Sequence, residues 1–255
     1  FPGCGPERWC WPVVLIGPYE HHSNILPWRE SGAEVIEIPE SATGGPCMKV
    51  LAATLAELKG RPVIGAFSAA SNVTGILTDV LAVTRVLKSA GAVVVWDYAG
   101  GAPYLTIDLC PAPDAQPDAV VLSPHKFVGG PQASGLLIVR HDAIRTAKPT
   151  LPGGGTVRFV SPTAHDYSAN VEAREEAGTP NVIGDIRAAL CFLVKAAVGQ
   201  DYITRRNREN HDRALRAWGA HPAIELLGNL TCERLPIFSF RLRNGAGGYV
   251  HQQLV

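Results

Sequence analysis

A lysine at the end of an apolar segment is the residue in this sequence best suited to covalent chemistry. Residues 118–122 form a short apolar run of the kind that a buried parallel strand requires, and Lys126 follows shortly after it. Because Phe127, Gly129 and Gly130 surround this amine, we expect it to be shielded from bulk water, which favours a neutral amine able to form a Schiff base. Taken alone, the pattern is more typical of a surface lysine in a glycine-rich turn.

A second apolar run, residues 92–96, ends in the carboxylate of Asp97. Neighbouring strands of one sheet would deliver Asp97 and Lys126 to the same edge. Pyridoxal 5'-phosphate chemistry needs an amine that holds the aldehyde and a carboxylate that keeps the pyridine nitrogen protonated, so that the ring can act as an electron sink. The pair therefore predicts a pyridoxal phosphate site.

Five motifs follow one another along the chain: Glu20-His21-His22-Ser23-Asn24, Ser71-Asn72-Val73-Thr74-Gly75, Trp96-Asp97-Tyr98-Ala99, Ser123-Pro124-His125-Lys126 and Glu176-Ala177-Gly178-Thr179-Pro180-Asn181. Their order and approximate spacing, over about residues 13–240, resemble the class V aminotransferase family, which contains the cysteine desulfurases and selenocysteine lyases. The resemblance implies an enzyme that uses pyridoxal phosphate on a small amino acid substrate, most closely cysteine desulfurase-like sulfur transfer or lyase chemistry. Its implied catalytic residues are Lys126, Asp97 and His21.

The resemblance assigns two further contacts to the cofactor ring. His21 would stack on the ring and move protons, and Asn72 would bond the phenolic oxygen. From the residues alone, His21 and His22 could instead cap a helix, and Asn72 could belong to an ordinary turn. Cysteine desulfurases usually carry a glutamine at the third position after the aspartate, where it bonds the same oxygen, but here Gly100 follows Asp97 at that position. Either Asn72 and water replace that bond, or the ring is tuned differently.

The phosphate contacts implied by the resemblance come from two places in the chain. Ser123 and His125 match the phosphate ligands of the same chain. Thr179 matches a threonine that reaches the phosphate of the neighbouring subunit, so the resemblance implies a homodimer with shared active sites. A hydroxyl and backbone amides at the start of a helix suit a phosphate, although Thr179 could also be an ordinary N-terminal cap.

The other patterns predict an α/β fold: a three-layer, mostly parallel sheet with helices on both faces. Strands are expected at 13–16, 33–38, 62–67, 92–97, 118–122 and 135–139, and helices beginning near 27, over 48–59 and 79–90, beginning near 181, and as one or two long helices within 182–218. Ligands bind such sheets at the carboxyl ends of the strands, which is where the motif residues fall. By resemblance this is the large domain of the fold type I pyridoxal phosphate enzymes.

The predicted organisation is an irregular start (1–12), a cofactor-binding large domain that is incomplete at its N-terminus (13–185), and linking helices with a truncated C-terminal α+β domain (186–255). The first strand of that last domain is expected at 237–242.

Composition narrows the class of partner. Lys+Arg and Asp+Glu are equal at 23 each, which gives no charge-based reason to expect nucleic acid or an anionic membrane surface. No apolar run approaches the roughly 20 residues of a membrane span. The 6 cysteines lack metal-ligand spacing and predict reduced thiols in an intracellular, cytoplasmic enzyme without a metal, although an even count leaves disulfides open.

The two ends of the sequence predict a piece of a longer protein, because it begins with Phe1 and stops at Val255 inside an unfinished pattern. We find no Gly-Thr-Thr-like phosphate turn, no substrate-binding arginine and no cysteine in the setting of a desulfurase nucleophile. The alternative function is therefore a catalytically inactive, truncated protein with this fold that serves as a binding or interaction module. The intact set of Lys126, Asp97, His21 and Asn72 favours an active enzyme.

Overall fold

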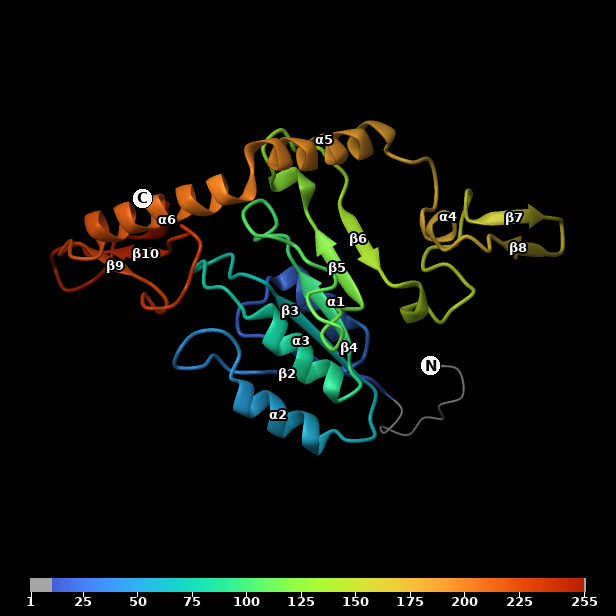
Figure 1. Ribbon diagram of the computed structural model, residues 1–255, viewed down its shortest axis with the longest axis horizontal. Helices are drawn as coiled ribbons and strands as arrows, with labels where there is room; N and C mark the ends of the chain where they lie inside the picture. The colour runs from blue at the N-terminus through green and yellow to red at the C-terminus, as the bar shows by residue number, and fades with distance from the viewer. Residues whose placement is uncertain (1–10, 255) are drawn as a thin grey trace.

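The computed structural model describes residues 11–254, and a six-stranded sheet lies at its centre (Figure 1). The strand order is β2-β1-β3-β4-β5-β6, and all pairs are parallel except β5 with β6. The strands are β1 (Val13–Ile16), β2 (Glu34–Glu37), β3 (Val63–Ser68), β4 (Val93–Asp97), β5 (Ala119–Leu122) and β6 (Leu136–Val139). The predicted α/β class and mostly parallel sheet are confirmed. The irregular start predicted for 1–12 lies almost entirely outside the described residues.

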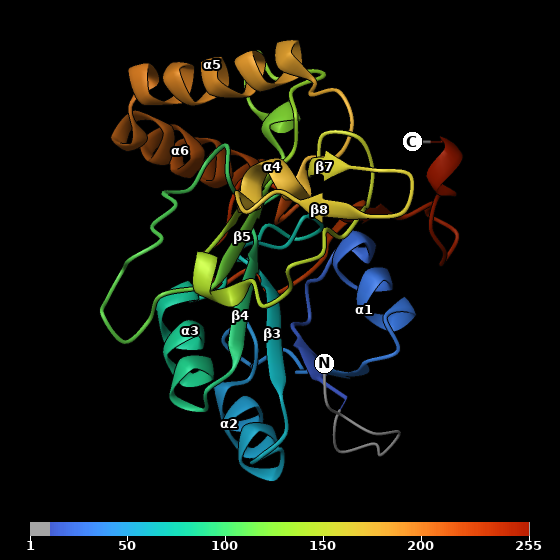
Figure 2. The same cartoon turned by 90° about the vertical axis from the view of Figure 1, so that its right-hand side faces the viewer.

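Helices cover both faces of this sheet because alternate residues of its strands point to opposite sides. Helices α2 (Met48–Glu57) and α3 (Val80–Ser89) pack on the face that carries Val13 and Leu15, while α1 (Leu26–Glu30) packs on the opposite face (Figure 2). Burying each large aliphatic side chain here stabilises the fold by about 1.5–3 kcal/mol.

Two long helices follow, as the sequence allowed. Helix α5 (Val182–Val198) passes over the upper end of the sheet, and α6 (Gln200–Trp218) leads away toward the C-terminal segment (Figure 1). Gly199 separates them with a φ of 87°, a left-handed conformation that other residues rarely adopt. On its inner side α5 packs Phe192 against Phe127, with ring centroids 5.1 Å apart.

Several short elements were not predicted. They are α4 (Val171–Glu175), the antiparallel pair β7 (Val157–Val160) and β8 (His165–Tyr167), and β9 (Ile224–Leu226), which pairs with β10 (Phe240–Leu242). The 3-10 turns are η2 (His22–Asn24), η3 (Pro124–Lys126), η4 (His141–Ala143) and η5 (Gln252–Leu254). Because β9 precedes β10, the prediction that residues 237–242 hold the first strand of the C-terminal part was wrong. The proposed domain boundaries stay a prediction.

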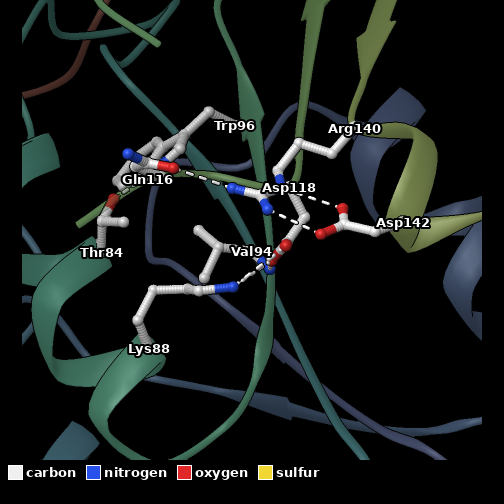
Figure 3. A network of polar contacts seen from close by, with 8 residues as sticks. All are labelled: Thr84, Lys88, Val94, Trp96, Gln116, Asp118, Arg140 and Asp142. Carbon is white, nitrogen blue, oxygen red and sulfur yellow. Dashed lines mark hydrogen bonds and ion pairs between the residues drawn. The ribbon is translucent and has the colours of Figure 1, made fainter. Parts of the chain in front are cut away.

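A network of polar contacts connects α3 to the amino ends of β4 and β5 (Figure 3). The Asp118 carboxylate accepts hydrogen bonds from the Val94 backbone N–H at 2.8 Å and from Lys88 Nζ at 2.8 and 3.0 Å. Because Lys88 belongs to α3, this carboxylate fastens the helix to two strands. The opposite edge is left for the motif residues.

Candidate active site

The register of the parallel strands lines up the carboxyl ends of β1, β3, β4 and β5. Ile16 lies opposite Ala66, Ser68 opposite Asp97, and Asp97 opposite Val121. His21, Asn72 and Lys126 each follow one of these strands within a few residues, and Asp97 is the last residue of β4. The fold therefore brings these four residues to one edge of the sheet, and Asp97 and Lys126 come from neighbouring strands.

The segment that carries Lys126 is a tight turn after β5. Lys126 ends η3, where its backbone N–H donates to the Ser123 carbonyl at 2.9 Å. A Cβ at Gly130 would lie 2.0 Å from the Pro124 carbonyl oxygen, so only glycine closes this turn. Phe127 is buried beneath it, but the Lys126 side chain is exposed. The expectation that Lys126 is shielded from water was wrong, because within residues 11–254 no segment covers its side chain at this edge.

The phosphate ligands implied for this chain flank the same turn. Ser123 is half-buried and precedes η3, where its side chain makes no cap bond, and His125 is exposed. Both lie next to Lys126 in the turn, so all three are available to a group bound at this edge.

Asp97 is half-buried at the end of β4. Its Oδ1 accepts a hydrogen bond from the Ala99 backbone N–H at 2.7 Å, and within residues 11–254 its Oδ2 makes no hydrogen bond. The hydrogen bond to Oδ1 thus fixes the carboxylate, and Oδ2 can accept a hydrogen bond from a protonated nitrogen. The preceding residue, Trp96, is fully buried and anchors the strand end.

The turn after β1 carries both the predicted His21 and a residue to which sequence reasoning gave no role, Glu20. The Glu20 carboxylate accepts four hydrogen bonds, from Gly17 N at 3.2 Å, Ser68 N at 2.8 Å, Ser68 Oγ at 2.7 Å and Asn24 Nδ2 at 2.7 Å. Burial raises the pKa of Glu20, the bonds from Ser68 and Asn24 oppose that rise, and the negative charge of Asp97 adds to it. The two acids lie near each other, because Ser68, which donates two hydrogen bonds to Glu20, is paired with Asp97 in the β3–β4 register.

His21 itself caps η2. Its Nδ1 accepts the Ser23 backbone N–H at 3.1 Å, and its ring centroid lies 3.8 Å from that of His22. The alternative prediction, that His21 caps a helix, is therefore confirmed for its Nδ1 atom. Stacking of His21 on a cofactor ring stays a prediction.

Asn72 is exposed in the turn that follows β3. The Ser71 hydroxyl accepts the backbone N–H groups of Val73 at 3.2 Å and Thr74 at 3.0 Å, which fixes the turn beneath it. A Cβ at Gly100 would lie 3.8 Å from Asn72 Cβ, so the glycine that replaces the expected glutamine lies directly beside Asn72.

Thr179 is exposed just before α5 and does not cap it. Asn181 is the N-cap of that helix, with its Oδ1 accepting the Gly184 N–H at 3.2 Å. The interpretation of Thr179 as the N-cap is thus wrong.

The described residues also bear on metals and membranes. Cys47, Cys110, Cys191 and Cys232 are free, and within residues 11–254 no three His, Cys, Asp or Glu side chains gather in a way that could hold a metal ion. The described part of the chain holds no helix with the length and apolar character needed to cross a membrane.

The mostly parallel sheet with helices on both faces is the fold of the pyridoxal phosphate-dependent type I enzymes, whose solved cysteine desulfurases it resembles. Sequence comparison makes this specific: the profile of the class V aminotransferase family matches residues 12–254, and the chain belongs to that family. Its members depend on pyridoxal phosphate.

The similar proteins are cysteine desulfurases. A probable cysteine desulfurase of Aeropyrum pernix is 31% identical over 205 residues, 77% of this chain and 48% of that protein. A cysteine desulfurase of Pectobacterium atrosepticum is 31% identical over 233 residues, 90% of this chain and 55% of that protein. The crystal structure of the cysteine desulfurase CsdA from Escherichia coli superposes with a TM-score of 0.81 at 27% identity, covering 96% of this chain and 58% of that one. The chain spans about half the length of the curated relatives it matches.

The residues present fit the family's cofactor. The Lys126 amine is exposed and makes no hydrogen bond or ion pair with any residue in 11–254, and Asp97 has one uncommitted carboxylate oxygen. An available amine and an available carboxylate on adjacent strands are the donor set that a pyridine aldehyde requires.

Proposed function

We propose that this chain carries the cofactor-binding part of a pyridoxal phosphate-dependent enzyme that acts on an amino acid, with cysteine desulfurase-like chemistry. The observation that carries the proposal is the pairing of β4 with β5, which places Asp97 and Lys126 at one sheet edge. The similarity to cysteine desulfurases favours sulfur removal over transamination.

The roles of the residues follow from their chemistry. The bound cofactor supplies an electron sink for the bonds of the substrate α carbon. Lys126 Nζ would hold the aldehyde of the cofactor, and the same amine would accept and return the α proton of the substrate. Asp97 Oδ2 would hold the proton on the pyridine nitrogen. His21 would cover one face of the ring, and Asn72 would donate its amide to the phenolic oxygen.

The phosphate is bound at the turn after β5. The Ser123 hydroxyl would donate to a phosphate oxygen, and the His125 ring would donate a second hydrogen bond beside it. Both groups are next to Lys126 in the turn, so they would hold the phosphate close to the residue that binds the aldehyde.

No cysteine of this chain is assigned as a sulfur acceptor. Burial raises the pKa of the Cys232 thiol, and its Sγ donates to the Thr43 carbonyl at 3.0 Å, which together disfavour the thiolate. The free thiols within residues 11–254, those of Cys47, Cys110, Cys191 and Cys232, support an intracellular compartment.

A homodimer with shared sites is part of the proposal. Thr179 is exposed at the start of α5, and the same helix exposes Ile183, Ile186, Leu190 and Leu193, apolar side chains that a second copy would cover. Mixing Lys126→Ala chains with Thr179→Ala chains should restore activity, because one site of each mixed dimer then holds both native residues. If each variant alone is inactive and dimeric and the mixture shows no activity either, the proposal of a shared site is refuted.

Covalent labelling tests the main proposal. The chain is incubated with pyridoxal phosphate, reduced with borohydride, digested and analysed by mass spectrometry, and the visible absorption is recorded before reduction. The peptide containing Lys126 should carry the label, and Lys126→Ala should lose both the label and the visible band. Lys59→Ala is the matched control, because Lys59 is also exposed but lies after α2, away from this edge.

An assay for sulfide release from cysteine then distinguishes an active enzyme from a catalytically inactive binding module. Label at Lys126 with sulfide release supports the enzyme. Label without any turnover of amino acids supports the binding module, and no label at Lys126 removes the cofactor from the proposal.

A further inference from the structure

The Glu20 carboxylate is the most heavily bonded side chain at the candidate active site. Its two oxygens accept from four donors, the backbone N–H groups of Gly17 and Ser68, the Ser68 hydroxyl and the Asn24 amide. Backbone N–H groups and the NH2 group of an asparagine can only donate hydrogen bonds. The side chain at position 20 must therefore accept, as an ionised carboxylate does.

These bonds close the turn around His21. Gly17 and Asn24 lie on either side of His21 in the sequence, and one carboxylate holds both. A Cβ at Gly17 would lie 2.8 Å from Glu20 Oε1, so the backbone approaches the acid closely. Within this closed turn the Asn24 N–H donates to the His21 carbonyl at 2.7 Å. The position of the His21 backbone is therefore set by Glu20.

The ring of His21 is oriented inside the same turn. Because the Ser23 backbone N–H donates to Nδ1 at 3.1 Å, the neutral ring carries its proton on Nε2. Nε2 is then the nitrogen of His21 that is left to exchange a proton at the site.

The third anchor of the carboxylate connects this turn to Asp97. Ser68, which gives two of the four bonds, is the residue opposite Asp97 in the β3–β4 register, and the next residue, Ala69, donates its N–H to the Asp97 carbonyl at 2.9 Å. Hydrogen bonds through Glu20 and Ser68 thus connect the turn that carries His21 to the strand end that carries Asp97.

We propose that Glu20 is a positioning residue that fixes His21 relative to Asp97, so that ring stacking and the pyridinium contact act on the same bound ring. The inference deepens the proposed function and rests on it. Glu20 does not touch the cofactor in this role. It acts through the backbone of residues 17–24.

Glu20→Gln is the sharpest test because it keeps the volume and replaces one acceptor oxygen with a donor. With the new amide nitrogen in the place of Oε2, the Ser68 hydroxyl can turn to accept from it, but the Asn24 amide nitrogen meets another donor, and the bond from Asn24 is lost. Glu30→Gln is the matched control, since Glu30 is exposed at the end of α1. Ser68→Ala, which removes only the hydroxyl bond, is the milder second variant.

Two measurements follow. Titration of the apo chain with pyridoxal phosphate, read as the Lys126-dependent absorption, should show about tenfold weaker binding for Glu20→Gln and no change for Glu30→Gln. Adding Glu20→Gln to His21→Ala should cause no further loss, because the effect of Glu20 passes through His21. Equal binding by Glu20→Gln and the native chain, or fully additive losses, would overturn the inference.

Nuclear magnetic resonance of the His21 imidazole nitrogens gives a readout that does not need the cofactor. The native ring should show an unprotonated Nδ1, and Glu20→Gln should shift its signals while Glu30→Gln leaves them unchanged. If the native chain binds no pyridoxal phosphate at Lys126, the proposed function fails, and unchanged His21 signals in Glu20→Gln would separately refute the positioning role.

Discussion

The hydrogen bond between Trp96 and Thr84 gives the most direct test of how the core holds Asp97 in place. Trp96 Nε1 donates to Thr84 Oγ1 at 2.8 Å, and both residues are fully buried, Trp96 in β4 and Thr84 in α3 (Figure 3). Asp97 directly follows Trp96, so the anchored indole holds the strand end that carries the carboxylate.

Thr84→Val replaces the hydroxyl with a methyl group of similar size and leaves the indole N–H buried without an acceptor. An unsatisfied buried donor costs about 1–3 kcal/mol of unfolding free energy. For a chain of this size that is a fall in melting temperature of about 2–4 °C for each kcal/mol. Burial of the apolar surface is nearly unchanged, so the lost hydrogen bond dominates the effect.

Urea and thermal unfolding of a double-mutant cycle measures this energy. Trp96→Phe removes the donor, so Thr84→Val made in that background should cost less than about 0.5 kcal/mol, giving a coupling of at least about 0.5 kcal/mol. Thr54→Val on α2 is the control for a threonine hydroxyl that makes no hydrogen bond within residues 11–254. If Thr84→Val costs the same free energy with either residue at position 96, the bond does not stabilise the chain and the reasoning is refuted.

Three further predictions concern the edge of the sheet. Gly100→Gln should tighten pyridoxal phosphate binding several-fold, because the space beside Asn72 admits a side chain and one new hydrogen bond is worth about 0.5–1.5 kcal/mol; unchanged binding in the titration would contradict it. Gly130→Ala should lower the unfolding free energy by about 1–3 kcal/mol and abolish the Lys126-dependent absorption, because its Cβ would meet the Pro124 oxygen. Burial raises the pKa of Tyr98 to about 12, so its contribution to stability is complete below about pH 10 and is lost as the pH rises toward 12. Tyr98→Phe should flatten this alkaline fall of the urea midpoint.

Most of the sheet could be predicted because its elements are defined by local patterns. The apolar runs of β1, β3, β4 and β5 are short and are bounded by glycine, proline or charge. Helices α2 and α3 end near Gly60 and Gly91, whose φ values of 89° and 74° suit a helix stop. Signals of this kind need no knowledge of distant partners.

The elements that were missed lack such a signal. Strands β7 and β8 form a hairpin whose residues Phe159 and Val160 are more than half exposed, so no alternation between buried and exposed positions marks it. Strand β9 has 3 residues, too few to show a period.

In the candidate site, too, some features could be predicted from local sequence patterns, whereas others depend on residues that are distant in the sequence. Parallel strands in one sheet bring their carboxyl ends together whatever their loops do, so a motif at each strand end predicts the shared edge of Asp97 and Lys126. The exposure of Lys126 depends on which segments cover that edge, and the residue's own neighbours do not determine it. The role of Glu20 depends on Ser68, which is 48 residues away, and no local pattern encodes such a pair. A buried acid that follows an apolar strand must find donors, however, because an unpaired buried carboxylate is costly. Glu20 could therefore have been recognised as a residue with partners, although its identity alone does not say that those partners lie beside Asp97.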